Sequence, residues 1–409
     1  LGTGTSKYSR SVCRDEWRQL LEARAAAGVP LVIGSCGTCG TASTVDWMFE
    51  ITCELAAELG QTLRVARLYS DVPVEALRHA RDADRLTPLH PAQATDDDAL
   101  ASMTNIVALA GAEQIQAAIN TGADVVLAGR ATDTASIAAL PLAHGAHAGG
   151  AWHGAKIAEC GAFCTTQPAS GVIMVSFDET GFTVTPMGEG VQCTPQSVAA
   201  HMLYENSDPW ILHEPGGHLD VTAATYTKAA QDGVRVEGAV WVDAANYKVK
   251  LEGARLVGHQ TMMLAVIRDP RYVEAVVDWA DLLLSHCRGL ISASLGLQDD
   301  AYDIDLRIIG VDAALGHLER DRGSPVEVGV MLLITANEQT VASEIAAVIN
   351  PHLLHYPLTD DEPMPTFAFP MSPVHSDRGA IYEFALNHVL RLADPMDGFR
   401  LQVDEVGNG

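Results

Sequence analysis

DVVLAGRATDTAS (Asp124–Ser136) decides the fold of this chain. Its four apolar residues, 125–128, run without interruption, which is typical of a strand buried on both faces. Gly129 ends the strand, a polar cluster follows, and an Ala-rich helix then begins. This position lies at the carboxyl edge of a parallel sheet, where open α/β folds bind their ligands. The stretch therefore predicts both a strand–helix unit and a binding site.

The polar cluster of Arg130, Thr132 and Asp133 suits an anionic ligand. Free backbone N–H groups at a helix N-terminus favour anions, and a guanidinium is a planar, two-pronged donor. We expect Arg130 and Thr132 to bind a substrate and Asp133 to hold its polar part. The alternative is structural: Thr132 or Asp133 caps the helix, and Arg130 is an ion-pair partner on the surface.

Length and charge restrict the classes of partner. The 409 residues are enough for two or three domains with cores of their own. Asp and Glu number 52 against 26 Lys and Arg, which gives a net charge of −26. Polyanions need a basic face, so we expect no nucleic acid and no anionic membrane surface as partner. A small anionic ligand would need a locally basic pocket.

The cysteines and the apolar runs indicate the compartment. No run of 18 apolar residues is present, and the eight cysteines are spaced unevenly, unlike a disulfide framework. Reduced thiols predict a cytoplasmic protein. The first residue is Leu1 rather than Met, so a preceding signal peptide stays open.

Cys36 and Cys39 form a CxxC motif, which beside a βαβ pattern suggests thiol redox chemistry. The chain is much longer than a thioredoxin domain, which weakens this interpretation. No second CxxC accompanies the motif, and His144, His147 and His153 lack a ligand-pair spacing with Cys160 and Cys164, so no metal site is predicted.

The order of periodic segments predicts the domains. Strand and helix alternate over residues 1–170, which predicts a doubly wound parallel sheet of the Rossmann or flavodoxin type. Residues 171–256 are expected to form a mixed hairpin and helix region that connects the modules and covers the pocket. Residues 257–357 run β-α-β-β-α-β, the order of a ferredoxin-like α+β module. Residues 358–409 are predicted as a C-terminal tail with one helix.

Finer predictions concern single elements. The last strand of the ferredoxin-like module is expected at Leu353–Tyr356 and the tail helix at Arg378–Leu392. A hairpin is expected at Gly171–Met187, and Thr194 with Pro195 is expected to begin a helix.

The glycine loop GSCGTCG (Gly34–Gly40) lies between a predicted strand and helix. Glycine permits positive φ and close backbone approach, so the loop can cradle a phosphate or a carboxylate. It is neither a Walker A loop nor a GxGxxG fingerprint, and the alternative is a plain tight turn. The candidate binding residues of this loop are Gly34, Ser35, Gly37, Thr38 and Gly40.

Asp71 ends a neighbouring strand at the same edge. It could orient a ribose or act as a base, or it could be a turn residue before Pro73.

AWHGAKIAECGAFC (Ala151–Cys164) is predicted as a helix that folds back over the pocket. Helical spacing places Lys156 and Glu159 on one face, with His153 three residues before Lys156. An acid, a base and a cation on one helix suit proton transfer beside a carboxylate or thioester. We expect Glu159 or His153 to transfer the proton and Lys156 to contact the substrate, with burial raising the pKa of the carboxylate and Lys156 opposing it. The alternative is a solvated face with a Lys156–Glu159 ion pair.

Lys248, Lys250 and Glu252 share one face of a strand-like run. In an acidic chain they predict an anion contact, or else an exposed strand face. The single histidines, His213 and His218 among them, are expected to be structural.

At GSCGTCG, GRATDTA, AWHGAKIAECGAFCT and CTPQSVAAHMLYENSDP, the chain resembles the acyclic terpene utilisation (AtuA-like) family, with the pieces in the family's order. The resemblance covers nearly the whole chain, and its motifs are specific in combination. It implies a soluble protein of carboxylic-acid catabolism, of the kind found beside acyl-CoA carboxylases and hydratases. Members typically begin with one more strand and helix, and the resemblance implies no particular reaction.

We therefore expect a catabolic enzyme that acts on a small or branched carboxylic acid or its CoA thioester by hydratase- or lyase-type chemistry. The sequence has no nicotinamide fingerprint, no metal cluster and no GxSxG motif, and addition or elimination can run on positioned acids and bases. No cofactor is expected, apart from CoA as part of the substrate, and a homo-oligomer is expected. The alternative is a non-catalytic ligand-binding or assembly subunit of an acyl-CoA catabolic complex.

Overall fold

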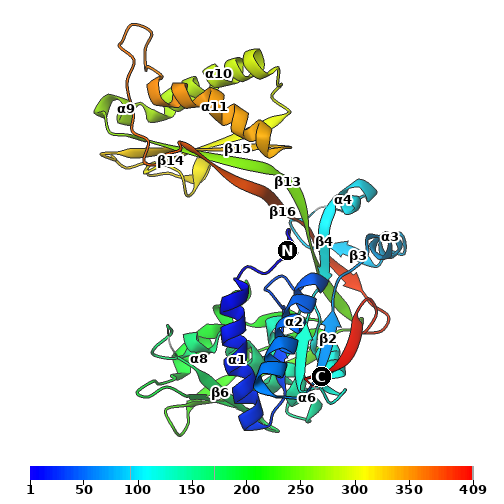
Figure 1. Cartoon of the computed structure of the whole chain (residues 1–409). Helices are drawn as coiled ribbons and strands as arrows, with labels where there is room; N and C mark the ends of the chain where they lie inside the picture. Colours follow the sequence, from blue (N-terminus) through cyan, green and yellow to red (C-terminus); the bar gives the residue numbers. More distant parts are fainter. Residues whose placement is uncertain (93, 170, 408–409) are drawn as a thin grey trace. The chain divides into compact units, whose positions relative to one another are not determined.

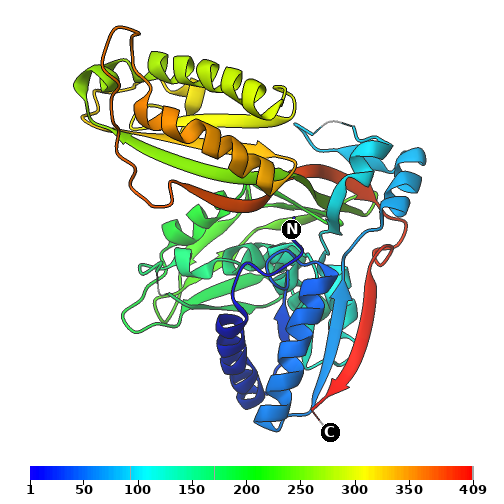
Figure 2. The same ribbon diagram turned by 45° about the horizontal axis from the view of Figure 1, so that its top comes forward.

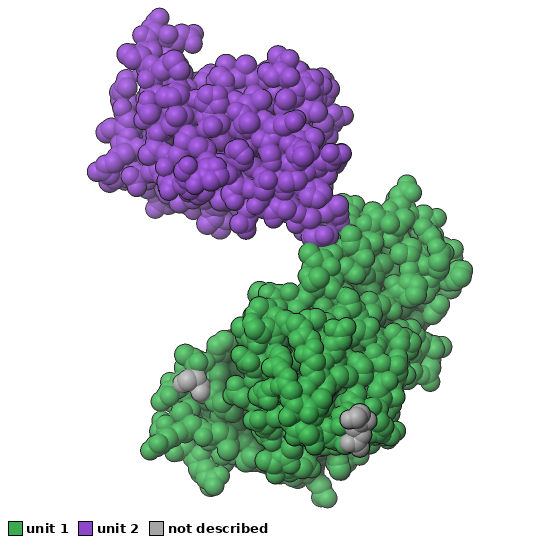
Figure 3. All heavy atoms as spheres, in the orientation of Figure 1, with its two compact units in different colours: residues 1–255, 384–409 green, residues 256–383 purple. Residues whose placement is uncertain are grey.

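The computed structural model describes residues 1–92, 94–169 and 171–407. The chain folds into two compact units (Figure 3). Unit 1 comprises Leu1–Arg255 and Phe384–Gly409, and unit 2 comprises Leu256–Glu383. Unit 2 is therefore inserted into the sequence of unit 1, and the last residues return to unit 1 instead of forming a separate tail. The predicted boundary at Ser170 lies outside the described residues.

The first sheet of unit 1 is mixed. Its strands follow the order β1 (Leu31–Ile33), β5 (Val125–Ala128), β2 (Leu63–Tyr69), β17 (Arg400–Val406). β1, β5 and β2 pair in parallel, and β17 is antiparallel to β2. All of β5 is buried, as its uninterrupted apolar run predicts. The prediction of a wholly parallel sheet is wrong at one edge, because a strand from the far end of the chain completes it.

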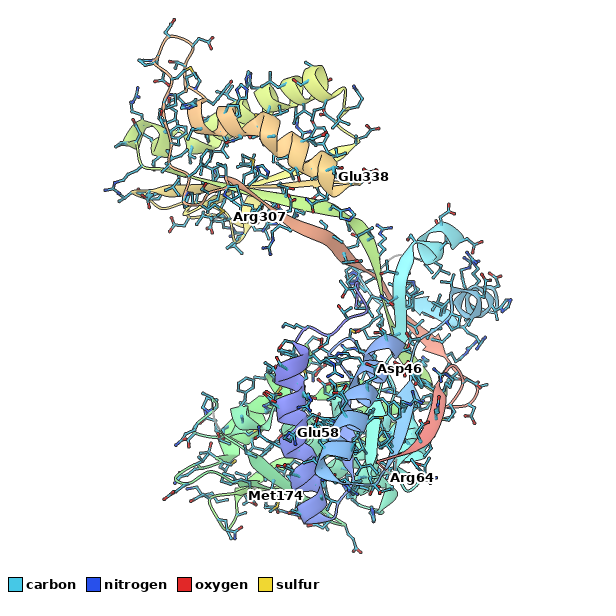
Figure 4. The ribbon with its side chains drawn as sticks, in the orientation of Figure 1. Asp46, Glu58, Arg64, Met174, Arg307 and Glu338 are labelled. Carbon is cyan, nitrogen blue, oxygen red and sulfur yellow. The ribbon has the colours of Figure 1, made fainter. Side chains whose placement is uncertain are left out.

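Helices cover both faces of this sheet. α1 (Arg10–Ala27) and α2 (Ala42–Leu59) lie along one face, where their apolar side chains pack against alternate residues of β2 and β5 (Figures 1 and 2). α5 (Ala112–Ile119) and α6 (Asp133–Ala143) pack against the other face through alanines. Between α1 and α2, Glu58 pairs with Arg14 and Arg18 (Figure 4).

α7 (Ala148–Ala158) is buried against two antiparallel sheets of unit 1. A Cβ at Gly149 would lie 2.1 Å from the carbonyl oxygen of Ala239. Glycine at this position therefore lets the helix approach the backbone of Ala239 closely. The predicted hairpin at Gly171–Met187 is confirmed as β6 and β7. The sheets are β10-β11-β7-β6 and β12-β9-β8, with β6 (Ile173–Phe177), β7 (Gly181–Pro186), β8 (Ile211–Glu214), β9 (Gly217–Asp220), β10 (Thr225–Lys228), β11 (Val234–Glu237) and β12 (Val240–Asp243).

Unit 2 is built on strands in the order β14-β15-β13-β16, with β13 and β16 continuing into unit 1. The first three strands and the helices of the predicted order β-α-β-β-α-β are present, but the last strand is β16, which lies beyond the predicted residues 257–357. The core of unit 2 joins the two long helices α10 and α11 to one face of the strands. The elements are β13 (Lys248–Ile267), α9 (Pro270–Glu274), α10 (Val276–Leu295), β14 (Tyr302–Ile309), β15 (Val328–Ala336), α11 (Gln339–His355) and β16 (His375–Arg391).

Two element predictions near the C-terminus are wrong. Leu353–Tyr356 is not a strand, because α11 continues through Pro351 and buries Leu353 in the core of unit 2. The predicted helix at Arg378–Leu392 is the strand β16, whose buried residues Leu386, His388 and Leu390 recur at a period of two.

The remaining elements complete unit 1. β4 (Met103–Ala108) pairs with the start of β13 and is not part of the first sheet. α8 (Pro195–Ala200) begins at Thr194 and Pro195 as predicted. α3 (Val74–Asp82), β3 (Leu86–Pro88) and α4 (Asp97–Ala101) stand between β2 and β4 in the chain. Among the described residues, no helix combines the length and the apolar character that crossing a membrane requires.

Candidate functional site

The glycine loop, Ser70 and Arg130 meet where β1, β2 and β5 end, as the carboxyl-edge rule predicts. The backbone N–H of Arg130 donates to the carbonyl of Gly40 (3.0 Å) and to the hydroxyl of Ser70 (2.6 Å). Gly40 has a φ of +65°, and a Cβ there would stand 2.2 Å from the Arg130 nitrogen. The loop is thus joined to the end of β5 by direct backbone contact that requires glycine.

The groups of this loop are largely bound by the chain itself. Ser35 N–H donates to the carbonyl of Gly129 (2.9 Å), and Thr38 N–H donates to the carbonyl of Ser35 (2.8 Å). On another side, the Ser43 hydroxyl, just after the loop, donates to the carbonyl of Gly4 (2.6 Å). The loop therefore acts as a structural joint here. Unit 1 has a cavity lined by Thr132 and Glu214. The candidate loop residues are not in its described lining: Gly34, Ser35, Gly37, Thr38 and Gly40.

The guanidinium of Arg130 is held by an acidic partner. Its Nε donates to Glu252 (3.0 Å) and its Nη1 to the Ser35 hydroxyl (3.3 Å). Lys250 donates to the second oxygen of Glu252 (2.9 Å), so the shared strand face predicted for these residues is an ion-pair cluster. Burial acts to raise the pKa of Glu252, but Arg130 and Lys250 outweigh it and hold that pKa below its usual value. Arg130 thus lies at the predicted place, where its guanidinium shares the Glu252 carboxylate with Lys250.

Two carboxyl groups converge on the first turn of α6. Thr132 caps this helix, as the structural alternative predicts, and its hydroxyl donates to Glu214 (2.5 Å). Thr134 donates to Glu159 (2.9 Å) and also lies within hydrogen-bonding reach of Glu214. Lys156 pairs with Glu159 and donates to the carbonyl of Tyr204 (2.7 Å). The Lys156–Glu159 pair is buried, with side chains 3% and 8% exposed, so it is not the solvated pair of the alternative interpretation.

Burial raises the pKa values of both carboxyl groups. The pKa of Glu214 rises to about 8, with the hydroxyls of Thr132 and Thr134 opposing this only in part. Burial also raises the pKa of Glu159, although Lys156 acts to lower it. Both predicted effects on this carboxyl group are therefore present, and burial is the stronger. Near neutral pH, Glu214 is an acid with a proton to donate.

A cavity of about 730 Å³ in unit 1 contains Glu214 and Thr132 in its lining. Its apolar wall is made by Pro88, Leu89, Leu109, Pro215, Val249 and Val389. Its basic residues are Arg85, Lys248, Lys250 and Arg391, and the rings of His213 and His218 lie 5.7 Å apart in the same lining. The described lining holds one other acidic residue, Asp84. In a chain of net charge −26, this is a locally basic pocket with an apolar wall.

The other predicted site residues are not brought together. His153 is fully buried, with its ring against Phe182 and its Nε2 3.2 Å from the Tyr226 hydroxyl. Burial lowers the pKa of His153 to about 3, so it is neutral. Asp133 is exposed at the start of α6. Asp71 accepts from the N–H of Ala42, and burial raises its pKa.

The two thiols of the CxxC motif differ. Burial acts to raise the pKa of Cys39, but hydrogen bonds with Thr41 and Thr44 outweigh it and lower that pKa. Cys36 is fully buried, and burial raises the pKa of its thiol, whereas reactive thiols have lowered pKa values and some exposure. In the part of the chain that the structure describes, no group of three or more His, Cys, Asp or Glu side chains could hold a metal ion.

Glu214 is the residue that sequence reasoning missed. It ends β8, before the turn Pro215-Gly216 of the β8–β9 hairpin. The signal available in the sequence is HEPGGH (His213–His218), a turn flanked by two histidines with an acid at its start. No local pattern connects this hairpin to α6, which lies about 80 positions earlier; Thr132 and Glu214 are 82 positions apart.

The fold and site define a mixed α/β protein with a cavity that has basic residues, an apolar wall and the carboxyl group of Glu214, whose pKa is raised. The family model of the acyclic terpene utilisation family protein AtuA matches residues 3–359, and the chain belongs to this family. No curated protein and no solved structure matches the chain.

Proposed function

We propose that the protein is a catabolic enzyme of acyclic terpene utilisation that acts on a small or branched carboxylic acid or its CoA thioester by hydratase- or lyase-type chemistry. One observation carries the proposal: Glu214, with its pKa raised to about 8, lies in a cavity that has basic residues and an apolar wall. The basic residues suit the anionic group of the ligand, and the apolar wall suits a branched hydrocarbon. The family membership supports the catabolic role.

The chemistry proposed is addition of water to a carbon–carbon double bond conjugated to the acid or thioester carbonyl, or its reverse. The water oxygen bonds to the β-carbon, and Glu214 gives its proton to the α-carbon. The proton that the water loses returns to the Glu214 carboxylate, so the enzyme is regenerated. Glu159 and Lys156, buried behind Thr134, hold the polar surroundings of Glu214 in place. The reaction needs no cofactor, because CoA enters only as part of the substrate.

We also propose the finer fold assignment, a doubly wound first module and a ferredoxin-like second one. Helices on both faces of β1, β5 and β2 support the first, and the order β14-β15-β13-β16 supports the second.

The test is turnover of Glu214→Gln with a panel of branched α,β-unsaturated acids and their CoA thioesters, with product measured by mass spectrometry. Gln keeps the size and a hydrogen bond to Thr132 but cannot transfer a proton, so we expect kcat to fall by about 10²–10⁴-fold with binding retained. Glu179→Gln, the same change at an exposed hairpin turn, is the matched control and should retain wild-type rates. Equal rates for Glu214→Gln and wild type would refute the role of Glu214. A ligand retained unchanged by wild type and variant alike would favour the binding-subunit alternative.

A further inference from the structure

Arg85 and Arg391 face each other across neighbouring strands. β3 and β16 are neighbouring strands (Figure 1). They pair antiparallel with Leu86 opposite Leu390, and the N–H of Arg391 donates to the carbonyl of Arg85 (2.9 Å). Each guanidinium reaches across the pair: Arg85 donates to the Arg391 carbonyl (3.4 Å), and Arg391 donates to the Asp84 carbonyl (3.3 Å). These contacts anchor both guanidinium groups to the same strand pair.

Arg85 and Arg391 form no ion pair with any residue that the structure describes. Within the described residues, no carboxylate lies within 4.0 Å of either guanidinium, although many arginines of this chain have such a partner, for example Arg67 with Asp46 and Asp404. Like charges that face each other across a strand pair destabilise it. The chain has twice as many acidic as basic residues, so carboxylates are abundant, yet none pairs with these two arginines in the described structure. The arrangement is therefore suited to an anion from outside the chain.

Both arginines line the cavity that contains Glu214, together with Lys248, an exposed lysine with no ion-pair partner among the described residues. Each guanidinium keeps N–H donors beyond the one that binds a backbone carbonyl, and the two charges together match a phosphoryl group with three oxygens and up to two negative charges. A carboxylate has a single charge, which one guanidinium is enough to neutralise. The volume of the cavity, about 730 Å³, also suits a ligand larger than a small carboxylic acid.

We propose that Arg85 and Arg391 form a phosphate subsite at this cavity, which takes a phosphoryl group of a CoA-linked substrate. The inference rests on the proposed function for the role of the cavity, and it narrows the substrate class from free acids to phosphorylated thioesters. The acyl group then lies toward Glu214, and the phosphoryl group lies between the two guanidinium groups.

Calorimetric binding of CoA, 3′-dephospho-CoA, inorganic phosphate and 3-methylbut-2-enoate tests this subsite. We expect Arg85→Gln/Arg391→Gln to weaken CoA binding by about tenfold for each arginine removed, and to leave binding of the free acid unchanged. Inorganic phosphate should compete with CoA in the wild type alone. If 3′-dephospho-CoA binds the wild type as weakly as CoA binds the variant, the subsite takes the 3′-phosphate; if it binds like CoA, the subsite takes the diphosphate.

The control is Arg320→Gln/Arg378→Gln, which removes two exposed arginines of unit 2 and changes the net charge equally. It should bind CoA like the wild type. Arg85→Lys/Arg391→Lys keeps the charges but loses the forks, and should give intermediate affinity with an unchanged melting curve. Unchanged CoA affinity in the Gln variant, an equal loss for the free acid, or no CoA binding by the wild type would each overturn the subsite. Because binding is measured without turnover, an inactive Glu214→Gln with unaffected arginine variants would retain the proposed function and reject the subsite.

Discussion

Glu214 is the residue through which pH acts on this site. Its folded pKa, about 8, lies above the ordinary value of 4.5, so the folded protein retains a proton that the unfolded chain has released between these pH values. Its contribution to stability is complete below pH 4.5 and is lost as the pH rises through 8. The same proton is the one that the proposed reaction uses, so activity and stability should both decline on the alkaline side.

We predict that raising the pH from about 5 to 9 lowers the free energy of unfolding of the wild type by roughly 2–4 kcal/mol more than that of Glu214→Gln. The amide cannot titrate, while every other group is common to both proteins. Urea unfolding of the two proteins at several pH values measures the difference. A difference that stays constant across this range would show that Glu214 ionises alike in the folded and unfolded chain.

The joint between the glycine loop and the end of β5 is the element on which the site depends. The loop touches the backbone that precedes α6, and α6 carries Thr132 and Thr134 to the two carboxyl groups. A change in the loop should therefore be felt at Glu214, although the loop does not line the cavity.

We predict that Gly40→Ala costs roughly 3–5 kcal/mol of unfolding free energy, because a methyl group would overlap the Arg130 backbone. Gly60→Ala is the matched control: Gly60 has a similar φ of +62°, but nothing lies within 4 Å of a Cβ there. The control isolates the backbone strain of an alanine at positive φ, about 1 kcal/mol. Chemical denaturation compares the two, and equal losses would mean that the loop yields without cost.

At the scale of the whole molecule, the two units have separate cores. Every buried residue of the unit 2 core, from Met263 to Phe367, lies within Leu256–Glu383. A unit with its own core and continuous sequence should fold alone.

We predict that a fragment of residues 256–383 folds with a cooperative urea transition. Trp279 is its one tryptophan and is fully buried, so its fluorescence should be blue-shifted and should change at the same urea concentration as the circular dichroism signal. Leu332→Asp, at a fully buried position, should abolish that transition. Red-shifted emission from the unaltered fragment would show that its core needs unit 1.

The elements that the sequence predicts well are those defined by short windows. The buried run of β5, the Thr132 cap, the Thr194–Pro195 helix start and the β6–β7 hairpin each depend on neighbouring residues only. β16 was predicted as a helix because its apolar residues fit either period, and strand pairing with β3 and β13 selects the period of two.

The candidate site divides in the same way. The sequence alone determined that the glycine loop and Arg130 meet at one sheet edge, that the chain is acidic, and that it resembles its family. Only the tertiary structure decided that Glu252 pairs with Arg130, that Thr132 donates to Glu214, and that Arg85 faces Arg391 across 306 positions of sequence. The physical reason is that periodicity and capping are properties of adjacent residues, whereas burial, pKa and charge pairing depend on which distant segments pack together.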